Sequence, residues 1–486
     1  MDRIRPTRAW ALFDAAASRA VEHATAARLP PHALMQRAGL AVAKLALAVA
    51  PHAKTIWVAC GPGNNGGDGF EAAMHLRSWG KNAVVTWAGD EGRAPADALA
   101  SVQRARAANV PFAGQVPADW ELAIDAMLGL GAARPLQGRL AEWAALMTSG
   151  ARPVLAVDLP SGLDADTGAG DPVRATHTLC LLTLKPGLFT GGGRDAAGQV
   201  WFHDLGLAHP AATPTAWLAR PPAAPARLQA SHKGSYGDVA IIGGAAGMAG
   251  AALLAATAAL HAGAGRVFAC LLDPGAPGFD PAEPGLMLRP WRSLDLSAMT
   301  VACGSGGGDA VREVLPAALG TARALVLDAD ALNAIAADTQ LQSLLKARAQ
   351  RQRPTVLTPH PLEAGRLLAC SAAQVQADRL GAGRELVQRF GCVVVLKGSG
   401  TVIAGPQRAP LINPTGSARL ATAGTGDVLA GLLAARLATA ASAFDAAAAA
   451  AYEHGQVGDA WPAGRALTAG ALARSVGLAL AAPAPR

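Results

Sequence analysis

The sequence predicts an α/β protein of two domains, the first of which is built on a doubly wound parallel sheet. Short runs of aliphatic and β-branched residues end in Gly or Asp and alternate with helical stretches in both halves of the chain. Such runs are typical of parallel strands that are covered by helices on both faces. A stretch rich in Pro and Ala separates the halves, and 486 residues exceed the usual length of one domain.

In the first half, the sequence predicts a helix over residues 33–50, where apolar residues recur at helical spacing. The apolar runs that follow predict strands at 55–60, 82–89, 121–126, 153–162 and 176–187. Strands of this length, separated by helices, form an open Rossmann-like sheet with helices on both faces.

Residues 210–230 read PAATPTAWLARPPAAPARLQA, a composition typical of a linker that its prolines hold semi-extended. We therefore place a first domain at 1–210, a linker at 211–229 and a second α/β domain at 230–486. The second domain repeats the alternation, with a helix at 250–265 and strands at 237–244, 266–272, 299–304, 324–330, 354–360 and 392–405.

The composition limits the kinds of binding partner and the cellular compartment that we expect for this protein. A net charge of +7 without a run of Lys or Arg, together with two Tyr and nine Phe, argues against nucleic-acid binding. No stretch of about 20 apolar residues predicts a membrane span. The six cysteines form no CxxC pair, which favours reduced thiols and a cytoplasmic enzyme. The Ala-rich helices are compatible with a homo-oligomer, and the sequence leaves the oligomeric state open.

The first unusual loop follows the strand at 55–60, at the end of a parallel sheet where ligands bind. It reads GPGNNGGDG over residues 61–69, with five glycines in nine residues, and a helix is expected directly after it. Close backbone approach, free N–H groups and the helix dipole together suit a phosphate. Two adjacent amides and Asp68 exceed what a tight turn needs, and the loop matches neither Walker A nor GxGxxG.

Two further strand ends carry oxygen donors. Asp125 ends one strand, where it is either a ligand contact or a helix cap. Asp158 ends the next strand, and Ser161 follows it in the turn. Asn65, Asp125 and Ser161 together offer one charge and neutral oxygens, a set suited to a monovalent cation.

Three charged residues nearby have simpler alternatives. Asp164 and Asp166 suit either a hydroxylated or cationic ligand or a solvated turn. Lys185 ends a strand and is either an anion contact or a surface lysine.

Four segments of the first half match a known pattern in order: ALMQRAG, GPGNNGGDG, DAMLGLG and DLPSGLDADTG. Over roughly residues 10–208 the chain resembles the NAD(P)H-hydrate epimerase domain. The resemblance implies that a hydrated nicotinamide nucleotide, NAD(P)HX, contacts Asn64, Asn65, Gly66, Gly67, Asp68, Gly129, Leu130, Gly131, Ala132, Ala133, Arg134, Pro135 and Asp158. It also implies that Asn65, Asp125 and Ser161 hold a potassium ion.

The sharpest motif of the second domain is AGTGDVL at 423–429, at the start of an expected helix. Its free N–H groups can hold a phosphate, and Asp427 can take a proton from a substrate hydroxyl. The alternative is an ordinary Gly–Asp helix cap. The motif resembles the anion hole of ribokinase-like enzymes, which implies a ribokinase-like α/β fold for the second domain.

Other strand ends of this domain agree with a nucleotide site. The KGSGT segment at 397–401 offers an ammonium, hydroxyls and free amides. His360 lies between two prolines, which fix its position, and we prefer ligand contact to core packing for it. Asp328 and Asp330 place carboxylates at another strand end.

KGSYG, GMAGAA, LDADALN, TPHPLE, KGSGT and AGTGDVL together resemble the ADP-dependent NAD(P)H-hydrate dehydratase, over roughly residues 228–482. The resemblance implies that ADP contacts Lys397, Gly398, Ser399, Gly400, Thr401 and Gly426. It implies that the hydrate contacts Ala251, Gly306, His360 and Asp427. Where that family has a GPGLG-like turn, this chain has GSGGG at 304–308, and we expect the loss of Pro and Leu to loosen the loop.

The two resemblances imply one repair pathway. The first domain would interconvert the (6R) and (6S) epimers of NAD(P)HX, with Asp158 as acid and base. The second would dehydrate (6S)-NAD(P)HX to NAD(P)H with ADP as co-substrate, giving AMP and phosphate. Asp427 would deprotonate the hydroxyl, and Mg²⁺ would offset the polyphosphate charge.

Two other functions stay open at this point. A ribokinase-type small-molecule kinase with a fused nucleotide-binding domain would share the GTGD motif, although GNNGGDG argues against it. A nucleotide-sensing scaffold would bind ligand without turnover. The residues alone leave open the choice between NADHX and NADPHX, and that between ADP and ATP.

Overall fold

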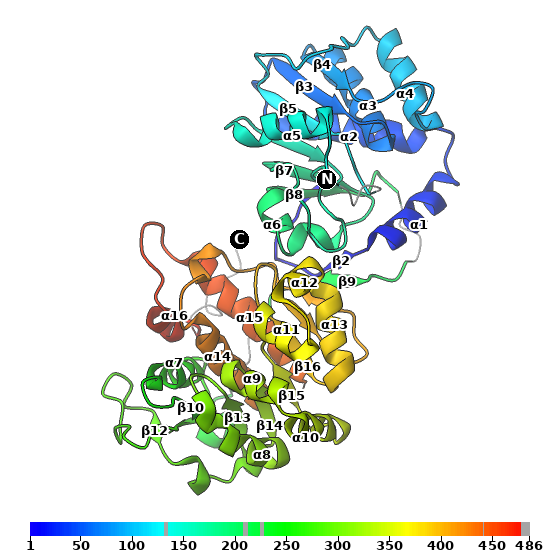
Figure 1. Ribbon diagram of the computed structural model, residues 1–486. Coiled ribbons are helices and arrows are strands. Elements are labelled where there is room, and N and C mark those ends of the chain that lie inside the picture. The colour runs from blue at the N-terminus through cyan, green and yellow to red at the C-terminus, as the bar shows by residue number, and fades with distance from the viewer. Residues whose placement is uncertain (131–134, 208–211, 224–227, 441, 478–486) are drawn as a thin grey trace. The chain divides into compact units, whose positions relative to one another are not determined.

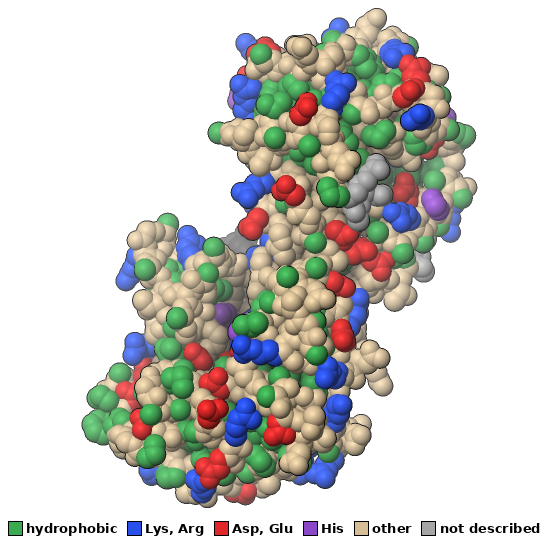
Figure 2. All heavy atoms as spheres, viewed as in Figure 1, with side chains coloured by type: hydrophobic (Ala, Val, Ile, Leu, Met, Phe, Trp, Pro, Cys, Tyr) green, Lys and Arg blue, Asp and Glu red, His purple; other side chains and the backbone are tan. Residues whose placement is uncertain are grey.

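Figure 1 shows the computed structural model, which describes residues 1–130, 135–207, 212–223, 228–440 and 442–477. The chain forms two compact units. The first unit comprises Met1–Arg5 and Trp10–Trp217, and the second comprises Pro6–Ala9 and Leu218–Arg486. Among the helices described, none is long and apolar enough to cross a membrane. Figure 2 shows Lys and Arg side chains interspersed with Asp and Glu over the visible face.

The first unit is built on a sheet in the order β1-β8-β7-β6-β5-β3-β4. Its strands are β1 (Asp2–Arg3), β3 (Thr55–Cys60), β4 (Asn82–Trp87), β5 (Leu122–Ala126), β6 (Val154–Val157), β7 (His177–Leu181) and β8 (Gln199–His203). The pairs from β4 to β8 are parallel, and β1 is antiparallel to β8. The chain runs from β3 to β4 on one side and returns to β5 on the other. This creates a switch point between β3 and β5, where ligands bind in such sheets.

Helices cover both faces of this sheet because successive strand residues point to opposite sides (Figure 1). The helices are α1 (Ala15–Ala26), α2 (Ala33–Val49), α3 (Asn64–Ser78), α4 (Ala96–Ala107), α5 (Arg139–Ser149) and α6 (Gly193–Ala196). Ile56 of β3 packs in a core that includes Val42 of α2 and Phe70 of α3. The next residue, Trp57, packs in a second core with Trp143 of α5. The predicted doubly wound α/β sheet is thereby confirmed.

In the second unit the strand order runs β12-β11-β10-β13-β14-β15-β16-β17-β18. Its strands are β10 (Asp238–Gly243), β11 (Arg266–Leu271), β12 (Met287–Leu288), β13 (Thr300–Cys303), β14 (Ala324–Leu327), β15 (Thr355–Leu357), β16 (Val393–Leu396), β17 (Val402–Ala404) and β18 (Leu411–Ile412). Pairing is parallel from β12 to β16 and antiparallel from β16 to β18. The carboxyl ends of β13 to β16 therefore lie along one edge.

The helices of the second unit follow its strands as an α/β alternation requires. They are α7 (Ala249–His261), α8 (Val311–Thr321), α9 (Ala329–Ala337), α10 (Thr339–Gln350), α11 (Pro361–Leu368), α12 (Ala372–Ala377), α13 (Arg379–Phe390), α14 (Thr425–Thr439), α15 (Ala443–Ala460) and α16 (Ala469–Ser475). Their alanines fill the core next to Val239, Val326 and Val395 of the sheet. Ala-rich helices can approach a sheet closely, which explains the composition of this half.

Several segments differ in detail from the sequence-based expectation, among them the run 176–187, where the strand ends at Leu181. The run 392–405 is a hairpin of β16 and β17 rather than one strand, because two positive-φ glycines turn the chain between them. The run 153–162 stops being a strand at Val157. The segment expected to be a linker contains β9 (Ala216–Leu218), whose two end residues are buried. Averaging the composition over a Pro-rich stretch concealed this short apolar strand.

Candidate active sites

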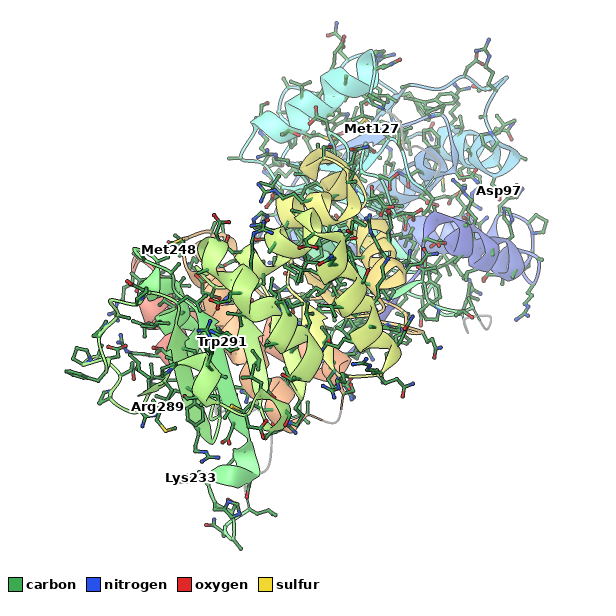
Figure 3. All side chains as sticks on the ribbon, turned by 60° about the horizontal axis from the view of Figure 1, so that its bottom comes forward. Asp97, Met127, Lys233, Met248, Arg289 and Trp291 are labelled. Carbon is green, nitrogen blue, oxygen red and sulfur yellow. The ribbon has the colours of Figure 1, made fainter. Side chains whose placement is uncertain are left out.

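The first unit contains a cleft of about 670 Å³ beyond the carboxyl ends of β3, β5 and β6. Its walls come from α1, the start of α3, and the loops that follow β5 and β7. Met127 and Asp97, labelled in Figure 3, belong to two of the lining segments. The cleft therefore lies at the switch point of the sheet, as expected for a ligand site.

The glycine-rich loop divides into lining and packing residues. Asn64, Asn65 and Asp68 line the cleft. Gly66 and Gly67 are buried beneath it, and a Cβ on Gly66 would lie 2.2 Å from the carbonyl oxygen of Gly61. The helix α3 begins at Asn64, so those two glycines allow close packing of its first turn, and the amide and carboxylate side chains face the ligand space.

The loop after β5 is described only in part. Gly129 and Leu130 line the cleft. Pro135 is exposed and does not line it. The predicted contacts Gly131, Ala132, Ala133 and Arg134 lie outside the described residues.

Asp125 and Ser161 meet below the cleft. The Ser161 amide donates to Oδ2 of Asp125 at 2.8 Å, and the Ser161 hydroxyl donates to Oδ1 at 2.5 Å. The amide of Leu128 donates to the same hydroxyl at 2.8 Å. Asp125 is fully buried, and burial raises its pKa to about 6 although these hydrogen bonds oppose the shift. The alternative of a helix cap is wrong, because the Asp125 carboxylate accepts hydrogen bonds from Ser161 instead.

Asn65, at the start of α3, lies close to the loop that contacts Asp125 and Ser161. A Cβ on Gly129 would lie 3.2 Å from Oδ1 of Asn65, so the amide contacts the loop next to Leu128. Its buried Nδ2 has no hydrogen-bond partner within the described part of the chain. The structure therefore gathers the three predicted cation ligands around one loop.

Asp158 is held in a strained backbone conformation, with φ of 65° in the left-handed region. The buried Lys185 ammonium donates to its carboxylate and also to the carbonyl of Leu181 at 3.2 Å. Burial opposes the charge on Lys185, but Asp158 raises its pKa above the ordinary value. The alternative of a surface lysine is wrong, since Lys185 is 1% exposed and faces a carboxylate.

The acidic turn after Ser161 serves the fold rather than the cleft. Oδ1 of Asp164 accepts from the amides of Asp166 and Thr167 at 3.0 and 2.8 Å, so it stabilises its own turn. Oδ1 of Asp166 accepts from the amide of Ala15 at 2.7 Å and so fixes the start of α1. Neither residue lines the cleft.

Sequence reasoning missed the residues of α1. Ser18, Arg19, Glu22 and His23 line the cleft, although they lie more than 30 residues before the glycine-rich loop. The one local signal is Asp14, whose carboxylate caps the helix by accepting from Ala17 at 2.8 Å. That signal predicts a helix start but not the face that meets the cleft.

The second unit assembles its polar residues at the ends of β13 to β16 and at the start of α14. Asp427 is the third residue of α14, and Gly424, with φ of 90°, precedes the helix. Burial and the Asp328 carboxylate raise the pKa of Asp427 to about 6, while a hydrogen bond from Ser305 and the charge of Lys397 oppose the shift. Asp427 lies in the first turn of α14 and Gly424 occupies the N-cap position, so Asp427 is not the N-cap residue.

Lys397 lies at the centre of these carboxylates. Its ammonium donates to Oδ1 of Asp328 at 2.6 Å and lies 3.9 Å from Oε2 of Glu363. A Cβ on Gly426 would lie 3.4 Å from the ammonium, so this glycine brings the N-terminus of α14 next to it. Lys397 thus joins the predicted nucleotide segment to the predicted base.

The rest of the KGSGT segment forms the turn between β16 and β17. Gly398 has φ of 135°, and a Cβ there would lie 2.9 Å from the buried Arg379 guanidinium. Arg379 donates to the carbonyl of Lys397 at 3.2 Å, which fixes the turn from below. Thr401 donates to the carbonyl of Gly398 at 3.1 Å. Ser399 and Gly400 complete the turn.

His360 lies at the N-terminus of α11, not in the core. Its Nδ1 accepts from the amide of Leu362 at 3.1 Å, and Glu363 accepts from the amide of His360 at 2.8 Å. Its side chain is 45% exposed, and burial and the charge of Lys397 lower its pKa. A neutral imidazole is therefore presented at the same edge as Asp328.

Ala251 and Gly306 lie together: a Cβ on Gly306, with φ of 58°, would be 2.9 Å from the Cβ of Ala251. Met248, labelled in Figure 3, packs beside them. In the GSGGG loop the amide of Gly307 donates to the carbonyl of Gly304 at 3.0 Å, and the amide of Gly308 donates to Asp330 at 2.9 Å. These hydrogen bonds hold the loop in place, although it lacks the Pro and Leu of the GPGLG-like turn.

Two family models match the chain. The model described as NAD(P)H-hydrate dehydratase matches residues 239–477, and that described as YjeF-related protein N-terminus matches residues 31–187. The bifunctional NAD(P)H-hydrate repair enzyme Nnr of Escherichia coli strain K12 is 36% identical over 458 residues, covering 88% of this chain and 84% of that protein.

Two further similarities concern the second unit. The ADP-dependent (S)-NAD(P)H-hydrate dehydratase of Neisseria meningitidis serogroup B is 42% identical over 272 residues, covering 54% of this chain and 88% of that protein. A crystal structure of ADP/ATP-dependent NAD(P)H-hydrate dehydratase from Bacillus subtilis, co-crystallized with ATP/Mg²⁺, is 30% identical with a TM-score of 0.46. It covers 53% of this chain and 93% of that chain.

The fold and the similarities define an α/β enzyme with a candidate site at the carboxyl ends of the parallel strands in each of two sheets. The chain belongs to the family of bifunctional NAD(P)H-hydrate repair enzymes. The relatives are named as enzymes that repair NAD(P)H hydrates. This agrees with the resemblance that the sequence motifs indicated.

Proposed function

We propose that this chain repairs NAD(P)HX in two steps. The first unit interconverts the (6R) and (6S) epimers, and the second dehydrates the (6S) epimer with ADP, giving NAD(P)H, AMP and phosphate. The observation that carries the proposal is the presence of both sites in one chain. Asp158 and the amides of Asn64 and Asn65 meet in one cleft, and Asp427 lies at a helix N-terminus beside Lys397.

In the first unit, Asp158 is suited to act as the base that takes a proton from the water returning to C6. The Lys185 ammonium orients its carboxylate, and the strained backbone at Asp158 turns it into the cleft. The nitrogen lone pair of the hydrated ring assists loss of the C6 hydroxyl. Return of water to the opposite face gives the other epimer, so the reaction requires no redox partner.

In the second unit, Asp427 takes the proton from the C6 hydroxyl, and the oxygen attacks the β-phosphorus of ADP. AMP leaves, and the new phosphate ester is a better leaving group than hydroxide. Amides at the start of α14 and the Lys397 ammonium stabilise the charge that develops on the transferred group. Loss of phosphate and of a C5 proton then restores the C5–C6 double bond.

Mg²⁺ and ADP belong to this second step. The carboxylates of Asp328 and Asp330 lie close enough to Asp427 to raise its pKa, and the Lys397 ammonium lowers it. This excess of carboxylate oxygens fits a divalent ion that arrives with the polyphosphate. We place ADP on Lys397–Thr401 and Gly426, and the hydrate on Ala251, Gly306, His360 and Asp427.

Product analysis tests the second step. We expect one AMP and one free phosphate for each NADH formed from (6S)-NADHX and ADP. A small-molecule kinase would instead leave a stable phosphorylated product and no free phosphate. Formation of such a product from the hydrate would contradict the dehydratase assignment.

We also propose that Asn65, Asp125 and Ser161 hold a potassium ion. Asp125 is fully buried, and no basic side chain of the described residues pairs with it. A monovalent cation would offset that buried charge, and neutral oxygens from Ser161 and Asn65 would complete its shell.

A cation exchange tests this site. Thermal unfolding of the first unit is expected to shift upward in KCl relative to LiCl at equal ionic strength, because the folded state alone forms the site. Epimerisation should fall several-fold in LiCl. Asp125→Asn should abolish the potassium-dependent shift. An unfolding temperature that is equal in both salts would contradict the assignment.

The remaining expectations stay predictions: a cytoplasmic location, neither nucleic-acid nor membrane partners, and a possible homo-oligomer. The six cysteines are free thiols, which agrees with a reducing compartment. The division into 1–210, 211–229 and 230–486 as epimerase, linker and dehydratase also stays a prediction.

A further inference from the structure

The helix α1 brings an additional carboxylate into the cleft of the first unit. Glu22 lines the cleft together with Asp68 and Asp158, so three acidic side chains face one ligand space. Glu22 lies outside the matched residues 31–187 and outside every motif of the sequence. Its placement depends on how α1 is fixed.

Four bonds fix α1 over the cleft. The first turn is held by Asp166, which accepts from the amide of Ala15 at 2.7 Å. One turn later, Thr183 donates to the hydroxyl of Ser18 at 2.8 Å. Arg19 donates to the carbonyl of Leu130 at 2.9 Å.

These bonds tie the helix to the loops after β5, β6 and β7, which form the walls of the cleft. Glu22 lies one helical turn after Ser18 and therefore on the same face, toward the ligand space. The fourth bond, from Ala17 to Asp14, caps the helix and prevents its first turn from fraying.

The carboxyl groups of the cleft have different charged neighbours. Burial, followed by the charges of Glu22, Asp158 and Glu71, raises the pKa of Asp68 well above its ordinary value. Burial and the charge of Asp158 also raise the pKa of Glu22. Asp158, in contrast, is paired with Lys185. Neighbouring carboxyls that cannot all ionise retain a proton between them.

We propose that Glu22 and Asp68 form a carboxyl pair that holds one proton and donates it to the departing C6 hydroxyl, with Asp158 as the base. This inference rests on the proposed epimerase function and assigns its acid. The proton moves to the hydroxyl oxygen, and the C6–O bond breaks with its electron pair on that oxygen. Water leaves, and the N1 lone pair forms an N1=C6 bond.

The return step reverses this change on the other face of the ring. Water adds to C6, the N1=C6 electron pair returns to nitrogen, and the water proton passes to a carboxylate. When Asp158 has taken that proton, it releases it to solvent while the carboxyl pair regains one, so the protons balance over the cycle. The cleft thus supplies both an acid and a base, which a single carboxylate such as Asp158 could supply only in turn.

The test is the variant Glu22→Gln in the full-length chain. Chromatography without ADP follows conversion of purified (6R)-NADHX to the (6S) epimer, after subtraction of the enzyme-free rate. We expect kcat for this conversion to fall about 100-fold, the lower range for loss of a general acid, with little change in KM. The exposed Glu142→Gln on α5, outside the cleft, is the matched control and should keep the wild-type rate.

The pH profile separates an acid from a structural residue. For the wild type, kcat for epimerisation should fall as pH rises, because the carboxyl pair loses its proton. Glu22→Gln should remove this fall of kcat or shift it to another pH. The groups facing the pair are Arg19 and His23 on α1, Asp158 and Lys185 beyond β6 and β7, and Glu71 on α3. Glu22→Asp retains a carboxyl and should keep this fall of kcat as pH rises, with partial activity.

Dehydration of (6S)-NADHX by the same preparation is the internal control for the second unit, and an unchanged thermal unfolding transition shows that the first unit is folded. A Glu22→Gln rate within about threefold of wild type, or a loss confined to KM with an unchanged pH profile, would overturn the inference. A wild-type protein that fails to epimerise (6R)-NADHX would instead overturn the proposed function itself.

Discussion

Replacing Asp427 with Asn is expected to stop dehydration of (6S)-NAD(P)HX, lowering kcat by about 10²–10⁴-fold, the usual contribution of a general base. The amide keeps the shape of the side chain and its contact with Ser305 but cannot accept the hydroxyl proton. Affinity for the hydrate should change little. Epimerisation in the first unit should keep its wild-type rate and show that the protein is folded.

The pKa of Asp427 also predicts how dehydratase activity falls at low pH. Because burial and Asp328 raise the pKa of Asp427 to about 6, its base form is lost as pH falls below that value. We expect kcat/KM with ADP to fall below about pH 6 and to be level above it. A variant Asp427→Asn that keeps more than a tenth of the activity, or a profile flat to pH 5, would show that another group takes the proton.

Replacing Asp158 with Asn is expected to stop epimerisation and also to destabilise the first unit. The ammonium of Lys185 is 1% exposed and would lose the carboxylate that compensates its charge. Removing one partner of a buried pair typically costs about 3–5 kcal/mol. Circular dichroism of thermal unfolding and epimer chromatography measure the two effects separately.

A double variant separates catalysis from stability. Asp158→Asn with Lys185→Met removes the unpaired charge, so most of the lost stability should return. Epimerisation should not return, because the base is still absent. If the double variant recovered activity together with stability, Asp158 would be a structural residue rather than a catalytic one.

The sheets were predictable because each buried parallel strand, such as β3 (Thr55–Cys60) or β16 (Val393–Leu396), is a continuous apolar run. The short strand β9 was not, because three apolar residues within a Pro-rich stretch give no periodic signal. The ends of strands were harder to predict from the sequence. β6 ends at Val157 because Asp158 has a positive φ that turns the chain, and the apolar pattern does not show this turn.

The positions of candidate site residues were predictable where those residues follow strands, as Asp125, Asp158 and Lys397 do. What the sequence could not supply is the pairing between distant segments. Lys185 reads as a surface residue until its ammonium is seen on Asp158, 27 residues away. Glu22 carries no motif, and it reaches the cleft only because α1 is bonded to three other loops. Such placement depends on tertiary contacts rather than on local pattern.

The most direct test of the whole account is recovery of absorbance at 340 nm from racemic NADHX with the purified full-length protein, Mg²⁺ and ADP. If both units are active, all of the hydrate should return to NADH, because epimerisation supplies the (6S) form as dehydration removes it. Recovery that stops near half would contradict an active first unit. The absence of recovery with either ADP or ATP would contradict the repair function.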